Sequence, residues 1–244
     1  MVDNFEEKFK EYAHLLVEVG MNLQKGQTVR ISSQVACAPL ARLCAEHALD
    51  CGARDVVMDW NDDFISRQRY LKADEAVFTE FPAYQKARYD WMLEKGCASL
   101  SIIGSDPETF KGVDPKRIQN WQKTCALPTK PYFDALESNR IQWSIGAYAT
   151  LAWAGKVFPD KEGEKAVDAL WDAIFSVCRI TGDGQGVARW KAHVAATTHR
   201  ASRLNEYNFK SLHYTNALGT DLTIVLPENH VWAGGADVTP AGLP

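Results

Sequence analysis

Three residues whose side chains bind transition metals recur at helical spacing: Cys44, His47 and Cys51. Residues three and seven positions apart lie on one face of a helix, so two thiols and an imidazole could share a zinc ion there. Together with Leu40, the same residues also form the inner stripe of an amphipathic helix, because a free cysteine packs as a small hydrophobic residue. We favour the packing role, since zinc sites usually show paired C-x-x-C or H-x-x-x-H ligands.

An acidic run, Asp59-Trp60-Asn61-Asp62-Asp63, follows a predicted strand. This is the carboxyl end of the strand, the edge at which α/β sheets place their binding sites. Carboxylates there could bind a cation or an amino group. Asparagine and aspartate also cap the amino ends of helices, and a predicted helix begins at this run, so we favour the capping role.

Alternating glycines at Gly182, Gly184 and Gly186 invite comparison with a phosphate-binding loop. Such a loop needs a strand before the glycines and a helix after them, so that backbone N–H groups face the anion. Here the preceding segment has helical spacing, and neither G-x-G-x-x-G nor G-x-x-x-x-G-K-[ST] is present. We interpret the glycines as a connector between two helices. The motifs G-x-S-x-G and H-E-x-x-H are absent as well.

The histidines form no recognisable catalytic set. They are His14, His47, His193, His199, His213 and His230. His193 and His199 lie six residues apart on a predicted helix, which places them on different faces. His213 and His230 lie near predicted strands and could approach each other. Neither has a carboxylate at a recognisable spacing, so we treat their proximity as coincidental.

Helical and strand patterns alternate along the first 150 residues and must position these side chains. Apolar spacing predicts helices over 4–24, 39–51, 62–72 and 82–95, and strands over 28–32, 53–60, 97–104 and 141–147. Ser105-Asp106-Pro107 predicts the cap of a short helix and Asp114-Pro115 the start of a longer one, while residues 126–139 fit either a helix end or a loop. This rhythm predicts an α/β protein with a mostly parallel sheet flanked by helices.

The pattern changes near Lys210. Two more helices are predicted over 167–178 and 187–204, and from Leu212 onward the apolar residues follow period two. The alternation of Leu222, Ile224 and Leu226 indicates a strand with one buried face, in a strand–turn–strand segment. We therefore predict an α/β domain over 1–210 and a β-rich segment over 211–244 that begins a second domain.

Composition excludes several classes of function. The chain has 244 residues, 46% of them hydrophobic, and a formal net charge of −4. No stripe of lysine and arginine marks a nucleic-acid surface. The amino terminus has no apolar signal region, and no apolar run approaches the ~20 residues that span a bilayer. We expect a cytoplasmic protein with no membrane partner, and its six cysteines reduced.

Three stretches resemble the thermophilic-type metallo-aminopeptidases, the family that includes aminopeptidase T, AmpS and PepS. They occur in the family's order along essentially the whole chain: YAHLLVEVGMNLQKGQTVRISS (12–33), DWNDDFISRQRYLKA (59–73) and LHYTNALGTDLTIVLPENHVWAGG (212–235). The third is the most specific and is similar to the strands that precede the family's catalytic region. The resemblance implies a cytoplasmic homodimer that removes N-terminal residues from a peptide substrate, using two divalent metal ions (Zn, Co or Mg).

The family's metal ligands are not recognised in this sequence. The resemblance places the first ligand in a P-T-E-E motif shortly after a Trp-x-Gly-Gly element, which here is Trp232–Gly235, and no P-T-E-E occurs. We therefore carry over no catalytic, substrate-binding or metal residue, and we expect no metal ion in this chain. The expectation is the N-terminal domain of a metal-dependent aminopeptidase, inactive alone.

Two alternatives to the aminopeptidase interpretation remain open, and one structural expectation distinguishes that interpretation from them. The chain could be a free-standing, non-catalytic α/β module for dimerisation or peptide binding, or a nucleotide-dependent enzyme that uses the loop at 182–186. If it is the first part of a larger enzyme, we expect residues 212–244 to pack less completely than the rest, or to take contacts from a neighbouring chain.

Overall fold

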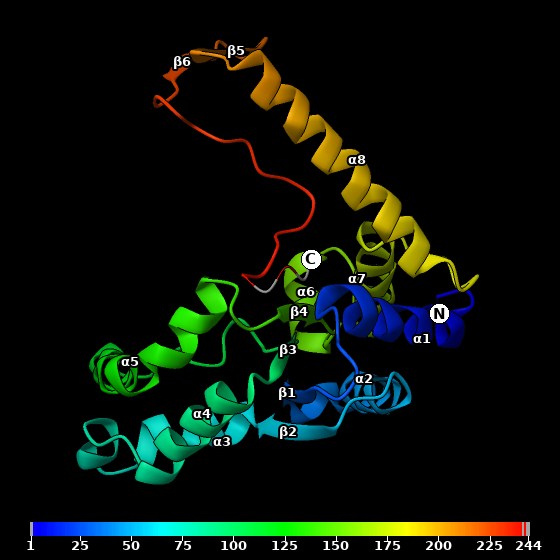
Figure 1. Ribbon diagram of the computed structural model, residues 1–244. Helices are drawn as coiled ribbons and strands as arrows, with labels where there is room; N and C mark the ends of the chain where they lie inside the picture. Colours follow the sequence, from blue (N-terminus) through cyan, green and yellow to red (C-terminus); the bar gives the residue numbers. More distant parts are fainter. Residues whose placement is uncertain (1, 241, 243–244) are drawn as a thin grey trace.

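A four-stranded parallel sheet forms the centre of the structure, a computed structural model that describes residues 2–240 and 242 (Figure 1). Its strands are β1 (Thr28–Gln34), β2 (Asp55–Asn61), β3 (Ala98–Ile103) and β4 (Trp143–Ala147), in the order β2-β1-β3-β4. All three pairings are parallel. The central strands, β1 and β3, carry the buried apolar residues that a sheet covered on both faces requires. The predicted α/β class with a mostly parallel sheet is confirmed.

Helices cover both faces of this sheet and continue beyond it. They are α1 (Phe5–Leu15), α2 (Ala38–Asp50), α3 (Asp63–Lys72), α4 (Ala83–Lys95), α5 (Pro115–Glu137), α6 (Leu151–Val157), α7 (Glu164–Val177) and α8 (Gly186–Tyr207). Short π or 3-10 turns follow α1 (η1, Leu16–Gly20), β1 (η2, Val35–Cys37) and α3 (η3, Glu75–Phe78). Of the helices of the described residues, none is both long and apolar enough to cross a membrane.

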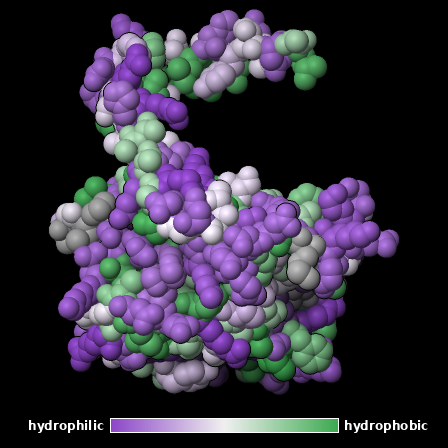
Figure 2. All heavy atoms as spheres, turned by 90° about the vertical axis from the view of Figure 1, so that its right-hand side faces the viewer, coloured by the Kyte–Doolittle hydropathy of each residue, from purple (hydrophilic) through white to green (hydrophobic). Residues whose placement is uncertain are grey.

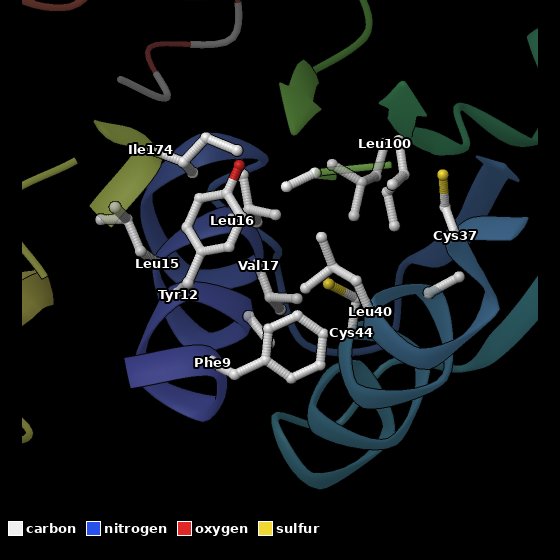
Figure 3. Packing of buried hydrophobic residues seen from close by; sticks show 14 of the residues in the cluster. Phe9, Tyr12, Leu15, Leu16, Val17, Cys37, Leu40, Cys44, Leu100 and Ile174 are labelled. Carbon is white, nitrogen blue, oxygen red and sulfur yellow. The ribbon is translucent and has the colours of Figure 1, made fainter. Parts of the chain in front are cut away.

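The main core lies between one sheet face and the helices α1, α2 and α7. In Figure 3, Phe9 of α1 points toward Leu40 and Cys44 of α2, whereas Tyr12 of α1 directs its hydroxyl away from α2. The hydroxyl of Tyr12 accepts a 2.8 Å hydrogen bond from the backbone N–H of Ala147, which satisfies its polar end. A smaller cluster, built from α4 and α5, covers the opposite face.

Three segments differ from the sequence predictions. Residues 126–139, which fitted either helix or loop, are helical almost throughout, because α5 continues past Pro128 and Pro131. An internal proline costs about 3 kcal/mol, and the burial of Tyr132 beyond the prolines offsets that cost. The short helix predicted after Ser105-Asp106-Pro107 is wrong: the segment forms turns, in which Asp106 accepts the N–H of Glu108. The helix α6 was not predicted.

The predicted strand–turn–strand near the C-terminus is confirmed as an antiparallel hairpin of β5 (Ser211–Thr215) and β6 (Asp221–Val225). It lies at the far end of α8, which projects away from the sheet (Figures 1 and 2). The predicted buried face is wrong, since Leu222 and Ile224 are 49% and 43% exposed. The looser packing expected of this hairpin is confirmed, and a domain boundary near Lys210 stays a prediction.

Candidate functional site

The acidic run lies at the carboxyl edge of the sheet, and its members have different roles. The side chain of Asp62 accepts the backbone N–H of Ile65 at 2.9 Å, which confirms the predicted helix cap. Asp63 accepts a hydrogen bond from Ser105 at 3.4 Å, and Ser105 in turn accepts one from Gln34 at 2.6 Å. These contacts join the ends of β1, β2 and β3 in one polar row.

Asp59 has no oxygen left for a cation or an amino group. Arg30 and Arg88 each approach one of its carboxylate oxygens to 2.8 Å, and its side chain is 13% exposed. Arg30 also donates to Ser99, whose hydroxyl accepts from Tyr132 of α5. Asp59 therefore bridges two arginines between the sheet and its helices. This pairing could not be predicted from the spacing, because its partners are 29 residues away in each direction.

A pocket of about 370 Å³ opens at the same edge, lined by residues 34–36 and 62–64. Cys37 follows the lining residues 34–36 in the chain, and its side chain is fully buried. Burial and, to a smaller extent, the carboxylate of Asp63 raise the pKa of the Cys37 thiol to about 11. At neutral pH this thiol stays protonated, so the pocket offers polar binding groups without an activated nucleophile.

The glycine loop does not form an anion site. It follows α7 and leads into α8, as a helix–helix connector should. The backbone N–H of Gly182 donates to Glu11 at 2.6 Å, and that of Gln185 donates to Asp183 at 2.9 Å. Two amides that a phosphate would need are thus already bonded to carboxylates, so the prediction of a connector is confirmed and the nucleotide alternative loses its support.

The two C-terminal histidines have separate partners. The Nε2 of His213 lies 2.6 Å from the Oδ1 of Asp221, across the hairpin, whereas the Nδ1 of His230 lies 2.9 Å from the carbonyl oxygen of Pro227. The prediction that no carboxylate stands at a recognisable spacing from His213 is wrong, because Asp221 contacts it. His213 pairs with Thr223 in the hairpin register, which puts Asp221 in the diagonal position, so the turn and the period-two pattern contained the signal.

The thiol–imidazole group predicted on α2 divides between the core and the surface. Leu40 and Cys44 are fully buried, which confirms the packing role for that part of the stripe. His47 and Cys51 are half-buried, with the Nε2 of His47 3.5 Å from the Sγ of Cys51. The structure adds His14 and Glu18, which face His47 from α1 and η1 and were not predicted to lie near it.

His14, Glu18 and His47 are, within residues 2–240 and 242, the group of three potential metal ligands whose donor atoms lie within 4.8 Å of one another. Glu18 Oε1 lies 2.9 Å from the Nε2 of His47. The two imidazoles stack with centroids 3.7 Å apart and planes 14° apart. Burial and the neighbouring His47 lower the pKa of His14, which favours its neutral form.

As arranged, these residues do not fit the metal centre of a peptidase. An ion bound to an imidazole lies in the plane of the ring, about 2.0–2.1 Å from nitrogen. Because the rings are stacked and nearly parallel, an ion in the plane of one ring lies well outside the plane of the other. We therefore derive no catalytic step from this cluster.

The Trp-x-Gly-Gly element lies against α8. Asn205 donates to the carbonyl of Trp232 at 2.9 Å and accepts its N–H at 2.7 Å, and Thr198 donates to the carbonyl of Gly234 at 3.2 Å. Two residues beyond Gly235, Asp237 accepts a hydrogen bond from Asn139 at 2.5 Å. A pocket of about 290 Å³ lies where this segment meets η1, α8 and the residues before β4.

This chain is similar to known proteins over nearly its whole length. Residues 5–244 match the family described as thermophilic metalloprotease (M29). The chain is similar to aminopeptidase PepS of Streptococcus thermophilus, with 42% identity over 243 residues, and to aminopeptidase AmpS of Bacillus subtilis (strain 168), with 36% identity over 241 residues. Each match covers 99% of this chain and 58% of the relative.

A solved structure shows the same arrangement in three dimensions. The structure of wild-type AmpT from Thermus thermophilus superimposes with a TM-score of 0.87 and 34% sequence identity, covering 98% of this chain and 58% of that one. The chain thus spans about 58% of the length of the relatives it matches. The resemblance inferred from the three sequence stretches is confirmed, and the chain belongs to the thermophilic metalloprotease (M29) family.

Proposed function

We propose that this chain provides the α/β scaffold of a cytoplasmic, homodimeric and metal-dependent aminopeptidase, which releases N-terminal amino acids from peptides. One observation carries the proposal: the family match continues over residues 5–244, and the relatives PepS and AmpS are aminopeptidases by name. The fold supports it, because the likeness to AmpT covers 98% of the chain.

The described residues indicate a positioning role for this part of the enzyme. The pocket at the sheet edge has no activated nucleophile, and the one cluster of three metal-ligand side chains in the described residues has stacked rings that do not converge on an ion. The Trp232–Gly235 element is instead fixed on α8 by Asn205 and Thr198. We propose that this contact holds the segment that leads to the catalytic region of the family.

A chimera tests the proposal. Residues 1–244 replace the matched 58% of Streptococcus thermophilus PepS. We expect the chimera to hydrolyse leucyl-p-nitroanilide when Zn²⁺, Co²⁺ or Mg²⁺ is added, and the 244-residue chain alone to show no metal-dependent turnover. PepS itself is the positive control. A folded chimera without activity contradicts the scaffold role, and robust turnover by the chain alone contradicts the assignment of catalysis to other residues.

The exposed hairpin favours a second candidate, a module for association with another chain. Leu218, Leu222 and Ile224 present apolar surface at its turn and along β6. If association is the only function, the 244-residue chain forms a stable dimer by sedimentation velocity while the chimera stays inactive. Charged substitutions such as Leu222→Lys would then release monomers.

A further inference from the structure

Two pairs of metal-binding residues face each other across the contact between α1–η1 and α2. His14 and Glu18 are four residues apart on one segment, and His47 and Cys51 are four residues apart on the other. Residues at this spacing lie on the same face of a helix, one turn apart. Because the two helices pack on each other, the ligand atoms of His14, Glu18 and His47 lie within 4.8 Å of one another at the surface, and the Sγ of Cys51 lies 3.5 Å from the Nε2 of His47.

The distances among these groups suit a shared ion. In a tetrahedral zinc site with bonds of about 2.0–2.3 Å, neighbouring ligand atoms lie roughly 3.3–3.7 Å apart. Here the Nε2 of His47 is 3.5 Å from the Sγ of Cys51, within this range, whereas its 2.9 Å distance to Glu18 Oε1 is a hydrogen-bond length that a shared ion would widen. Imidazole nitrogen, thiolate sulfur and carboxylate oxygen are the donors that Zn²⁺ and Co²⁺ accept.

The surroundings allow an ion to enter and the rings to adjust. A pocket of about 200 Å³ opens beside the two histidines, bordered by Lys10, Glu46 and Asp50. The two carboxylates and Glu18 outnumber the single lysine, so the local charge favours a cation. His14 is exposed, so its ring can leave the stack by rotation about its side-chain bonds, as a shared ion would require.

We propose that His14, Glu18, His47 and Cys51 form a surface site for a single Zn²⁺-class ion, which clamps α1–η1 to α2. Binding of the ion would replace the Glu18–His47 hydrogen bond and the imidazole stack. On binding, the ion replaces the proton of the Cys51 thiol and that of any charged imidazole, and these protons are released to solvent. The site is separate from the peptidase chemistry proposed above and does not depend on it.

The test uses the 244-residue chain, stripped of metal with a chelator. Titration with ZnCl₂ by calorimetry should show one ion bound per chain, and CoCl₂ should produce a thiolate-to-cobalt charge-transfer band. His14→Ala should weaken Zn²⁺ binding by at least about tenfold, since even loss of a supporting residue typically weakens metal binding 10- to 100-fold. Cys51→Ser should abolish the charge-transfer band.

Matched variants keep the test decisive. His199→Ala removes an exposed histidine of α8, and Cys125→Ser removes a half-buried thiol of α5, and both should bind Zn²⁺ like the parent chain. Circular dichroism checks that each variant folds. If His14→Ala does not fold, Glu18→Gln takes its place, because it preserves the shape of the side chain and should also weaken Zn²⁺ binding. The proposal is overturned if the parent chain does not bind Zn²⁺, or if the folded His14→Ala and Glu18→Gln chains bind Zn²⁺ as tightly as the parent chain.

Discussion

The sheet with its covering helices and the arm formed by α8 and the hairpin are stabilised in different ways. In the sheet, Val29, Ile31 and Leu100 are fully buried, and they form one core with residues of α1, α2 and α7. Along α8 only Gly186 is buried, and every residue of β6 is exposed. Near its start, α8 packs Trp190 against the core, and polar contacts such as Arg189 with Glu11 and Asn205 with Trp232 join the arm to the body and to its own C-terminal segment.

This difference indicates that the buried residues of the sheet and its helices, which we call the body, contribute most of the free energy of unfolding, and the arm contributes little. Burial of an aliphatic side chain contributes about 1.5–3 kcal/mol, whereas a surface ion pair contributes about 0–1 kcal/mol. We therefore expect the body to resist unfolding as a unit, and the arm to open at low cost. A low-cost opening suits a segment whose apolar surface is available for packing against another protein surface.

The largest expected effect comes from deleting core volume in the body. Leu100→Ala, on the central strand β3, should lower the free energy of unfolding by about 2–5 kcal/mol, because it removes a fully buried side chain and leaves a cavity. Ile224→Ala in β6 is the matched substitution in the arm and should change it by no more than about 0.5 kcal/mol. Urea denaturation followed by circular dichroism measures both values. Equal losses from the two substitutions would remove the distinction between body and arm.

A second effect, of intermediate size, concerns the joint between the two regions. The buried carboxylate of Glu11 accepts the N–H of Gly182 at 2.6 Å and an N–H of Arg189, the fourth residue of α8, at 2.8 Å. Glu11→Gln keeps the shape and removes the charge, so we expect a loss of about 1.5–3 kcal/mol. Thermal and urea denaturation measure the loss, and hydrogen exchange should show faster exchange at the start of α8.

Two controls separate this joint from ordinary surface charge. Glu94→Gln, in an exposed pair with Lys95, should leave the free energy of unfolding within about 0.5 kcal/mol of the parent value. Arg189→Lys should lower the free energy of unfolding even though it keeps the charge, because lysine cannot reach Glu11 and Asp183 with two separate N–H groups as the guanidinium does. If Glu11→Gln is as mild as Glu94→Gln, the arm is held by something other than this network.

The same contrast explains what the sequence could predict. The spacing of apolar residues predicted the four strands and most helices of the body, because buried faces impose regular spacing. Glycines and prolines marked the ends of elements; Gly96, for example, ends α4 with the left-handed backbone expected there. In the hairpin, the period of Leu222 and Ile224 predicted the strand correctly but not its exposure. Periodicity shows which residues share a face, and not whether anything covers that face in this chain.

Side-chain clusters were harder to predict than elements. The capping role of Asp62 is local and was predicted, whereas the role of Asp59 depends on two arginines 29 residues away. His47 was considered with its own helix, Cys44 and Cys51, and its actual neighbours come from α1. Spacing along one helix is visible in a sequence; contact between two helices is not, unless their packing is already known.

A third prediction concerns the C-terminal segment that packs on α8. Asn205 makes two hydrogen bonds to the backbone of Trp232, so Asn205→Ala should cost about 1–2 kcal/mol of local stability. Because the contact lies within the arm, the free energy of unfolding of the body should not change. Hydrogen exchange followed by mass spectrometry should show faster exchange in peptides over residues 228–240 only. Faster exchange in β1 or β3 would mean that arm and body open together.

The smallest expected effect is a pH dependence at the joint. Hydrogen bonds from Arg189 and from the backbone N–H of Gln185 lower the pKa of Asp183 well below its ordinary value. A carboxyl group with a lowered folded-state pKa contributes stability that is complete above about pH 4 and is lost as the pH falls through the folded-state pKa. In Asp183→Asn, the decrease in melting temperature between pH 5 and pH 2.5 should therefore be smaller than in the parent chain. Asp160→Asn, in another exposed loop, should leave the decrease unchanged, and an identical decrease in Asp183→Asn would show that Asp183 does not couple α8 to the body through its charge.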